Sequence, residues 1–512
     1  MTTELLQDSN ACYRALQTRD ARFDGRLFVG VTSTGVYCRP VCRVRTPKPA
    51  HCRFFALPAQ AEQAGFRPCL RCRPELAPAD RHWSFHDAGQ KLLAHALQWL
   101  DNPARLGSGT DGRPPLPALC RELGISDRHL RRLFVDRLGL PPLRYLQTRR
   151  LLTAKLLLTD TRLPVAEVAL ASGFGSVRRF NDVFVQAYGL EPGRFRRAQP
   201  AEAGTADLSP RATLAWRPPM DVEGMVAFLR RRLTPGNEWM ATDDEPVLLK
   251  AVRLTHQGRD HRGWIRLCWV ASAGGVRLEA SPTLVALLPQ VIWRVRRWLD
   301  LDTDTAHIDR LLERDFPGSA GMRLPGGFDP FELGVRAILG QQVSLAAAGR
   351  LTARLVEALG DPVVTPQPSV TRLFPTAEQL ACTPAERLGE LGIVRQRQQA
   401  LLAFARACAA GTLDLEEGGE PQALVERLVQ LPGIGPWTAH YLVMRASRWS
   451  DAWLPSDAAL RAALPSPRGP RTPAELQALA QRWRPWRSYA VVRAWTRPPG
   501  HPIIQNTTGD LP

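Results

Sequence analysis

One stretch late in the chain combines a tight backbone turn with a single carboxylate. Residues 431–460 read LPGIGPWTAHYLVMRASRWSDAWLPSDAAL. Gly433 and Gly435 leave backbone N–H groups uncovered where a helix restarts at Pro436, and such a helix N-terminus binds phosphate. Asp457 follows about twenty residues later, where the pattern predicts the start of a new helix. A phosphate seat beside one acid predicts a protein that holds a nucleic-acid backbone and does chemistry next to it.

A second group of reactive side chains lies near the N-terminus. Four of the ten cysteines form a C-x3-C pair and a C-x2-C pair, with 26 residues between the pairs. Two short pairs of this kind close a tetrahedral zinc site, here Cys38, Cys42, Cys69 and Cys72. The spacing alone favours a purely structural zinc site. Cys12 and Cys52 lack partners at that spacing and are expected to be ordinary buried thiols.

The charge of the chain indicates a polyanionic partner and is unevenly distributed. The net charge is +18 over 512 residues. Residues 1–199 hold 31 Lys and Arg against 17 Asp and Glu, and the remainder holds 36 against 32. We therefore expect a nucleic acid to be the partner, with most of the electrostatic affinity in the first 199 residues.

The chain shows no sign of export or of membrane insertion. Its first ten residues, MTTELLQDSN, lack a charged-then-apolar signal pattern, and no apolar run reaches the length of a membrane span. Ten cysteines in such a chain indicate free thiols or metal ligands, not disulfides. We therefore expect a cytoplasmic protein without a membrane partner.

Residues 81–198 carry a repeated helical pattern. A short helix over 116–123 is followed by Gly124 and by a helix that Ser126 caps, and Val165 to Ser172, Gly173 and a helix capped by Ser176 repeat that order. A long amphipathic helix lies between them. Two helix-turn-helix units joined by one helix can enter successive major-groove turns.

The string GFGSVRRFNDVFVQAYGLEPGRFRR, at 173–197, closely resembles the AraC-type signature. The resemblance implies binding to double-stranded promoter DNA and transcriptional activation, with RNA polymerase as the expected protein partner. Half or more of the contacts in such complexes reach only phosphate. The candidate base-facing residues are Ser126, Arg128, His129, Arg132, Ser176, Arg178 and Arg179.

The cysteine region resembles a known methyl acceptor. TSTGVYCRPVCRVR and AGFRPCLRC look very like the amino-terminal domain of the Ada adaptive-response regulator. The resemblance implies that Cys38 takes a methyl group irreversibly from a DNA methylphosphotriester while it and the other three cysteines hold one zinc ion. Arg39, Arg43 and Arg45 are expected to contact the DNA beside the metal. A zinc site with only a structural role is the alternative.

The stretch described first resembles the helix-hairpin-helix DNA glycosylases. LPGIG, GPWTAHY, the aspartate of LPSD and RWRPWRSYAVVRAW match the AlkA branch, the 3-methyladenine glycosylases II. The resemblance implies that Asp457 is catalytic and that Trp437, Tyr441 and Trp495 line the base pocket, although core packing would also explain these rings. Asp451 is expected to be a solvated loop charge.

The AlkA resemblance extends upstream of the hairpin. ATLAWRPPMD resembles the start of that family's first domain, and MRLPGGFDPFELGVRAILGQQVSLAAAGRLTARLVEAL continues it into the helix that approaches the minor groove. Gln342 falls where the family inserts a residue into the space that a flipped nucleotide leaves. Glutamine can fill that space or hydrogen-bond to the orphaned base, and both readings stand.

The residues around the turn also bear on the type of glycosylase. Related bifunctional enzymes place a lysine just after the turn to form a Schiff base with the sugar. Trp437 occupies that position, and no lysine follows Lys250. No cysteine follows Cys408, so we expect no iron–sulfur cluster. The resemblance implies a monofunctional glycosylase.

These observations predict a multidomain, mainly α protein with small α/β parts. We expect a four-cysteine zinc domain over 1–80, two helix-turn-helix units over 81–198, a linker over 199–210, an AlkA-like α/β domain over 211–320, an all-α helix-hairpin-helix glycosylase domain over 321–500 and a tail over 501–512. The predicted function is alkylpurine excision joined to methylphosphotriester-sensing activation. The alternative is a DNA-binding regulator whose glycosylase half is inactive.

Overall fold

The computed structural model divides the chain into two compact units, which are described in turn. It describes residues 8–78, 88–106, 116–197, 209–242, 244–256, 259–416, 420–464 and 471–496. Unit 1 comprises Met1–Arg217, Val247–Arg296 and Leu301–Thr303, and unit 2 comprises Pro218–Pro246, Arg297–Asp300 and Asp304–Pro512. Most of the predicted linker at 199–210 and all of the predicted tail at 501–512 lie outside the described residues.

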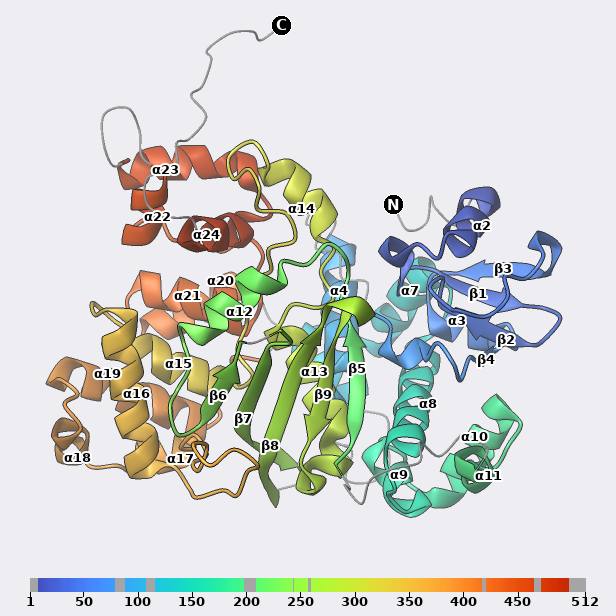
Figure 1. The fold of residues 1–512 in the computed structure, drawn as a ribbon, viewed down its shortest axis with the longest axis horizontal. Helices are drawn as coiled ribbons and strands as arrows, with labels where there is room; N and C mark the ends of the chain where they lie inside the picture. Colours follow the sequence, from blue (N-terminus) through green and yellow to red (C-terminus); the bar gives the residue numbers. More distant parts are fainter. Residues whose placement is uncertain are drawn as a thin grey trace, which may run out of the picture. The chain divides into compact units, whose positions relative to one another are not determined.

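Unit 1 begins with a four-stranded sheet that brings the two cysteine pairs together (Figure 1). Its strands are β1 (Phe28–Val31), β2 (Val36–Cys38), β3 (Cys52–Phe55) and β4 (Arg67–Pro68), in the order β3-β1-β2-β4. β2 and β4 run parallel, with Tyr37 opposite Pro68. Cys38 and Cys69 therefore leave the sheet side by side. The flanking elements are α2 (Ser9–Gln17), α3 (Pro58–Gln63) and the 3₁₀ turns Ala21–Phe23, Pro49–His51 and Pro74–Leu76.

The next part of unit 1 is helical, and the predicted pair of helix-turn-helix units joined by one helix is confirmed. The helices are α4 (Ala88–Asp101), α5 (Pro103–Leu106), α6 (Leu116–Leu123), α7 (Asp127–Leu138), α8 (Pro142–Asp160), α9 (Val165–Ala171), α10 (Val177–Tyr188) and α11 (Pro192–Arg197). α7 and α10 each have 12 residues, begin after a serine whose hydroxyl accepts a backbone N–H, and end at a left-handed glycine. This shared capping makes them equivalent helices of two repeats.

Helix α8 packs against α3 and the Pro74–Leu76 turn of the cysteine-bearing domain (Figure 1). Buried polar groups join these elements. The ammonium of Lys155 lies 2.5 Å from a carboxylate oxygen of Glu75, and the side chains are 1% and 2% exposed. Lys155 also donates to the Cys69 carbonyl at 3.0 Å. Glu62 accepts from the hydroxyls of Thr148, at 2.9 Å, and Tyr37, at 3.1 Å. Burial raises the pKa of Glu62 to about 7, although both hydroxyls and Lys155 oppose the shift.

The raised pKa of Glu62 predicts a pH-dependent local stability. Its folded value of about 7 lies above the ordinary 4.5, so between these values the folded chain keeps a proton that the unfolded chain releases. This group's contribution to stability is therefore full below about pH 4.5 and falls by about 3 kcal/mol as the pH rises to about 7. Glu62→Gln should remove that fall, measured as hydrogen-exchange protection of α8 amides at several pH values.

The exposed carboxyl of Glu167 on α9 supplies the control for this prediction. Glu167→Gln should leave the pH dependence of α8 protection as it is in the parent chain. Parallel pH curves for Glu62→Gln and the parent would contradict the prediction.

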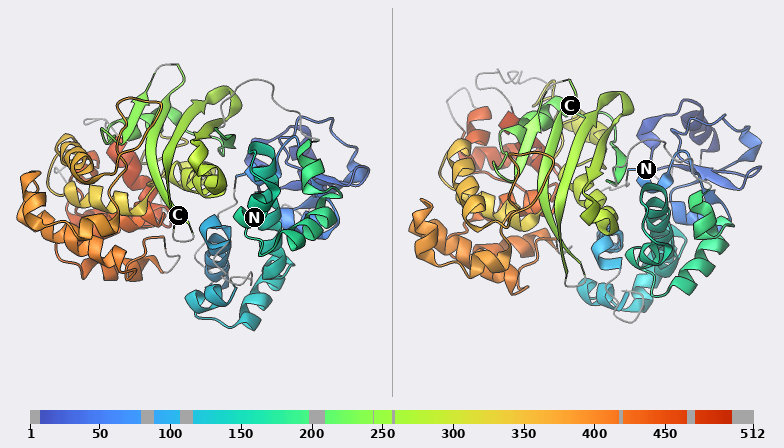
Figure 2. Two further views of the ribbon diagram at one scale, coloured as in Figure 1. Left: turned by 90° about the horizontal axis from the view of Figure 1, so that it is seen from below. Right: turned by 60° about the horizontal axis from the view of Figure 1, so that its bottom comes forward.

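Unit 1 also contains an antiparallel sheet in the region predicted to be α/β (Figure 2). Its strands within unit 1 are β5 (Arg211–Ala215), β9 (Gly275–Ala280), β8 (Arg259–Val270) and β7 (Val247–His256), in that order. Residues Leu248, Leu267 and Leu278 stand opposite one another across three strands and are all buried. The 3₁₀ turns Ala271–Ala273 and Pro282–Leu287 follow β8 and β9, and α13 (Leu288–Trp298) comes next.

The described residues of unit 2 are mainly helical and include the strand β6 (Glu238–Ala241). Its helices are α12 (Val222–Arg230), α14 (Thr305–Leu312), α15 (Pro330–Leu339), α16 (Leu345–Leu359), α17 (Ala377–Ala381), α18 (Ala385–Glu390), α19 (Arg395–Ala409), α20 (Pro421–Val429), α21 (Pro436–Ala446), α22 (Ala458–Ala463), α23 (Pro473–Ala480) and α24 (Arg487–Thr496), with the 3₁₀ turn Gln481–Trp483. Among the described residues, no helix is long and apolar enough to cross a membrane.

Helix α21 lies between the two hydrophobic cores of unit 2. Leu442 and Val443 belong to a core with Phe404 of α19, whereas Met444 belongs to a second core with Trp483. Tyr441 packs against both cores. The hairpin that precedes α21 is therefore supported from two sides.

Candidate active site and metal centre

The turn between α20 and α21 is the predicted hairpin. Gly433 has a φ of +75°, and a Cβ there would come within 2.8 Å of the Cβ of Ala400, so both conformation and space require glycine. Gly435 is exposed and is the N-cap residue of α21, without a side chain to cover the first N–H groups. The uncovered start of a helix of 11 residues is thus held rigidly at the surface.

Asp457 occupies the N-cap of α22, as expected for the start of a new helix. One carboxylate oxygen accepts the Leu460 backbone N–H at 2.7 Å and the indole N–H of Trp495 at 3.1 Å. The other oxygen accepts the indole N–H of Trp437 at 3.0 Å. Asp457 is 7% exposed. Three neutral N–H donors therefore fix the direction of a carboxylate that has no cation among these partners.

The three aromatic residues predicted to form a base pocket lie together beside this carboxylate. Trp437 and Tyr441 are stacked, with ring centroids 5.2 Å apart and planes at 13°. Tyr441 and Trp495 are 5.9 Å apart at 43°. All three rings are partly buried against the core. The arrangement joins aromatic faces and one acid within a single cluster.

Arg445 supports this cluster and was missed by the sequence analysis. It is buried and donates to Tyr441 Oη at 2.5 Å and to the carbonyls of Pro325 and Gly326 at 2.9 and 2.8 Å. Burial alone would raise the pKa of Tyr441, but the cations of Arg445 and Arg232 lower it. The i,i+4 spacing from Tyr441 to Arg445 on one helix was the signal available in the sequence.

Gln342 lies at the surface just after α15, in a left-handed conformation with φ +55°. Its neighbour Gln341 donates to the Gly433 carbonyl at 2.9 Å and to Thr438 Oγ1 at 3.1 Å. Arg397 donates to the Gln341 carbonyl at 2.6 Å. The exposed Gln342 is therefore attached to the hairpin through its neighbour.

Asp451 corrects one expectation. It is 5% exposed and not a solvated loop charge. Arg487 donates to its two oxygens at 2.7 and 2.9 Å, and Arg484 donates at 3.1 Å. The prediction was wrong because both partners come from more than 30 residues further along the chain.

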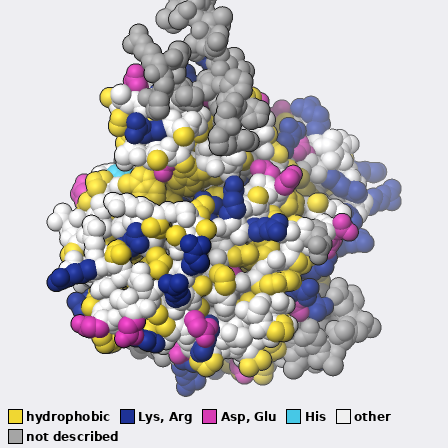
Figure 3. Space-filling model, turned by 60° about the vertical axis from the view of Figure 1, so that its left-hand side comes forward, with side chains coloured by type: hydrophobic (Ala, Val, Ile, Leu, Met, Phe, Trp, Pro, Cys, Tyr) yellow, Lys and Arg dark blue, Asp and Glu magenta, His cyan; other side chains and the backbone are white. Residues whose placement is uncertain are grey.

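On the face of the molecule in Figure 3, hydrophobic side chains gather in a hollow, and Lys and Arg side chains lie around it. This face includes part of unit 2. A mixed surface of this kind suits a nucleic acid, whose phosphates and bases need different partners.

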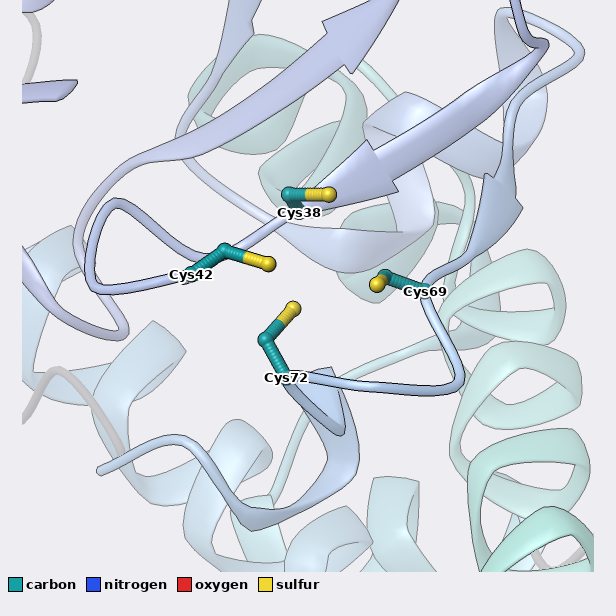
Figure 4. A group of neighbouring side chains, drawn as sticks. All are labelled: Cys38, Cys42, Cys69 and Cys72. Carbon is teal, nitrogen blue, oxygen red and sulfur yellow. The ribbon is translucent and has the colours of Figure 1, made fainter. Parts of the chain in front are cut away.

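The four cysteines of unit 1 form one cluster. Their sulfur atoms lie within 4.8 Å of one another and point toward a common centre (Figure 4). Hydrogen bonding with Cys38 lowers the pKa of Cys42 to about 7 and also lowers that of Cys69. Four converging cysteine sulfurs fit a tetrahedral zinc ion.

Backbone donors distinguish the four sulfurs. Cys72 Sγ accepts the Arg39 backbone N–H at 3.3 Å, and the backbone N–H groups of Val44 and Cys72 contribute to lowering the pKa values of Cys42 and Cys69. Within the described part of the chain, the recorded partners of the Cys38 sulfur are the other three cysteines. Hydrogen bonding with Cys42, Cys69 and Cys72 raises the pKa of Cys38, so a bound metal cation would be needed to keep its sulfur a nucleophilic thiolate.

Arg39 is a second correction, because its guanidinium is not available to phosphate. The residue is 8% exposed, and its Nε donates to Asp24 at 2.7 Å. It also donates to the Cys72 carbonyl at 2.9 Å. Arg39 therefore stabilises the turn that carries Cys72. Asp24, which binds Arg39, could not be identified from the sequence. Arg43 and Arg45, also predicted to contact DNA, are exposed beside the cluster.

The predicted base-facing residues of the two helix-turn-helix units are all exposed. They lie at the start of α7 or α10: Ser126, Arg128, His129 and Arg132 in the first unit, and Ser176, Arg178 and Arg179 in the second. The two serines cap their helices through contacts with the His129 and Arg179 backbones. The arginines and the histidine are thus presented on equivalent helix starts.

Four family models match consecutive parts of the chain. They are the metal binding domain of Ada at residues 11–75, a helix-turn-helix domain at 119–198, the AlkA N-terminal domain at 211–329, and the HhH-GPD superfamily of base excision DNA repair proteins at 335–488. Their order is the order of the structural parts described above.

Three relatives cover different shares of the chain. A Mycobacterium tuberculosis protein named "Probable bifunctional transcriptional activator/DNA repair enzyme AlkA" is 36% identical over 97% of this chain and 98% of its own length. Escherichia coli DNA-3-methyladenine glycosylase 2 is 33% identical over 55% of this chain and 96% of that protein. The E. coli bifunctional transcriptional activator/DNA repair enzyme Ada is 33% identical over 27% of this chain and 35% of that protein.

The parts thus occur together, in one order, along almost the whole length of a relative. The chain belongs to the family of bifunctional transcriptional activator/DNA repair enzymes of the AlkA type.

Proposed function

We propose that this chain excises alkylated purines from DNA as a 3-methyladenine glycosylase and reports DNA methylation through Cys38 to its helix-turn-helix units. The glycosylase role rests on the hydrogen bonds of Asp457: each of its two carboxylate oxygens accepts the indole N–H of one pocket tryptophan. Zinc at the four cysteines and DNA binding by both halves accompany this function.

The aromatic cluster suits a base with a positive charge. A glycosylase must first rotate the nucleotide out of the duplex. N3- or N7-alkylation makes a purine cationic, so the faces of Trp437, Tyr441 and Trp495 attract it. The same charge makes the base a good leaving group, and the site needs no strong acid to protonate it.

Asp457 acts on the sugar and not on the base. Positive charge develops on the sugar ring as the glycosidic bond breaks, and a fixed carboxylate stabilises that charge or orients the attacking water. The C–N bond breaks and the base leaves with its electron pair. A C–O bond to water forms, and that water releases a proton. Trp437 stands where a lyase has its lysine, so the product is an intact strand with an abasic site.

The hairpin and Gln342 hold the DNA during this reaction. The uncovered N–H groups at Gly433 and Gly435 bind a backbone phosphate. Gln342 enters the space left by the rotated nucleotide. The hydrogen bonds of Gln341 to the hairpin link this contact to the phosphate contact of the hairpin.

The Cys38 thiolate takes the methyl group from a methylphosphotriester. A sulfur–carbon bond forms, the carbon–oxygen bond breaks, and an ordinary phosphodiester leaves. Bound zinc would keep the cluster thiolates deprotonated. Methylation removes about one negative charge near Arg43 and Arg45, so repulsion of the DNA backbone falls and affinity rises. The exposed starts of α7 and α10 then read promoter DNA, and RNA polymerase is recruited.

The glycosylase role predicts base release without strand cleavage. The full chain, incubated with alkylated duplex DNA, should release free 3-methyladenine and leave strands that break only after alkali treatment. Asp414→Asn, which changes an exposed carboxylate of unit 2, should behave like the parent. Strand cleavage without alkali would contradict the monofunctional assignment, and DNA binding without base release would favour the regulator alternative.

A further inference from the structure

Helices α7 and α10, here called the recognition helices, both end against side chains of the domain that carries the four cysteines. The carbonyl oxygen of Leu138, the last residue of α7, accepts from Gln60 Nε2 at 2.9 Å. The carbonyl oxygen of Tyr188, the last residue of α10, accepts from Arg67 Nη1 at 3.0 Å. Equivalent atoms of the two repeats are thus bound by two side chains that are seven residues apart.

These two carbonyls need external donors. The last carbonyls of a helix have no partner within it, and Gly139 and Gly189 turn the chain away through left-handed conformations. A donor or a cation at such an end also interacts favourably with the helix dipole. Gln60 and Arg67 therefore cap the two helices from outside their own repeats.

The two capping residues are anchored in their own domain, Gln60 through its side chain and Arg67 through its backbone. Gln60 Oε1 accepts the backbone N–H groups of Ala56 and Leu57 at 3.0 and 3.1 Å, which orients its Nε2 toward α7. Arg67 stands opposite Val36 in the parallel β2–β4 pair and lies two residues before Cys69. The donor to α10 is therefore part of the short strand that leads into the metal cluster.

The helix between the repeats is bound by the same domain. Lys155 of α8 contacts the Cys69 carbonyl and Glu75, and Thr148 contacts Glu62. One domain thus contacts the end of α7, the length of α8 and the end of α10. With three attachments to one domain, the two recognition helices keep a fixed separation.

We propose that Gln60 and Arg67 are positioning residues for DNA reading, which hold the two recognition helices in the register needed to occupy two successive major-groove segments of one duplex. This inference rests on the proposed promoter binding. Neither residue contacts DNA in this role. Loss of a cap leaves each helix able to bind its own segment but weakens simultaneous binding of both, because the two helices must then be aligned during binding.

The test uses the full zinc-loaded chain and a DNA duplex that the wild-type chain selects from random sequence. A second duplex has the same sequence except that the base pairs bound by α10 are scrambled. Arg67→Met and Gln60→Leu should each weaken binding to the intact duplex about tenfold, the effect of one hydrogen bond. Binding to the scrambled copy should not change. The salt dependence of Kd should also stay the same, because no phosphate contact is lost.

Arg14→Met supplies the charge-matched control, since Arg14 is exposed on α2 of the same domain. It should leave binding to both duplexes unchanged. Zinc content and helix content of every variant must equal those of the parent. Equal weakening on both duplexes, a shallower salt dependence, or no weakening would overturn the positioning role. Selection of no duplex by the wild-type chain would instead refute promoter binding itself.

Discussion

Asp457→Asn is expected to lower the single-turnover rate of 3-methyladenine excision by roughly 100-fold or more, the effect of removing one preorganised electrostatic group. Asparagine keeps the size of the side chain and still caps α22 at the Leu460 N–H. It removes the negative charge that opposes the developing sugar cation. The measurement is release of free base from alkylated duplex with protein in excess.

Asp304→Asn is the matched control for this variant. Asp304 is also an N-cap aspartate of unit 2, at the start of α14, where it accepts the Ala306 N–H at 3.1 Å. The Asp304→Asn variant should excise 3-methyladenine at the same rate as the parent. Equal excision rates for Asp457→Asn and the parent would show that Asp457 has no catalytic role, even if the two proteins bound DNA with different affinities.

Cys38→Ala is expected to abolish methyl uptake from methylphosphotriester DNA, from one methyl per chain to none. The acceptor is consumed by the reaction, so the loss is of stoichiometry and not of a rate. Cys42, Cys69 and Cys72 should still retain zinc, because three protein ligands suffice when the fourth position is open. Intact-protein mass after incubation and zinc content per chain are the measurements.

Cys52→Ala provides the thiol control, because Cys52 lies on β3 outside the four-cysteine cluster. It should take up one methyl on Cys38. Uptake by Cys38→Ala, or peptide mapping that places the methyl on Cys72 of the parent, would contradict the acceptor assignment.

The elements that could be predicted from the sequence are those with local signals. Ser126 and Gly139 mark both ends of α7, and Ser176 and Gly189 repeat those marks for α10. The turn at Gly433 and the cap at Asp457 are also encoded within a few residues. Capping and left-handed turns act over one helical turn, so a pattern in the chain reports them directly.

The contacts that could not be predicted join residues distant in the chain. The sequence around Asp451 indicates a surface acid, but in the fold its carboxylate binds Arg487. The sequence around Arg39 indicates a phosphate ligand, but in the fold its guanidinium binds Asp24. The two indoles that hold Asp457 come from 20 residues before it and 38 after it. Such pairings depend on the packing of whole helices, which no local spacing records.

The most direct test of the two-function account uses one duplex population that carries both 3-methyladenine and methylphosphotriesters, in excess over the full chain. Released base and protein-bound methyl are counted in the same reaction. The account predicts that released base continues to exceed the amount of protein, whereas methyl stops at one per chain and lies on Cys38. Base release that stops at or below one per chain, or methyl on any other residue, would contradict it.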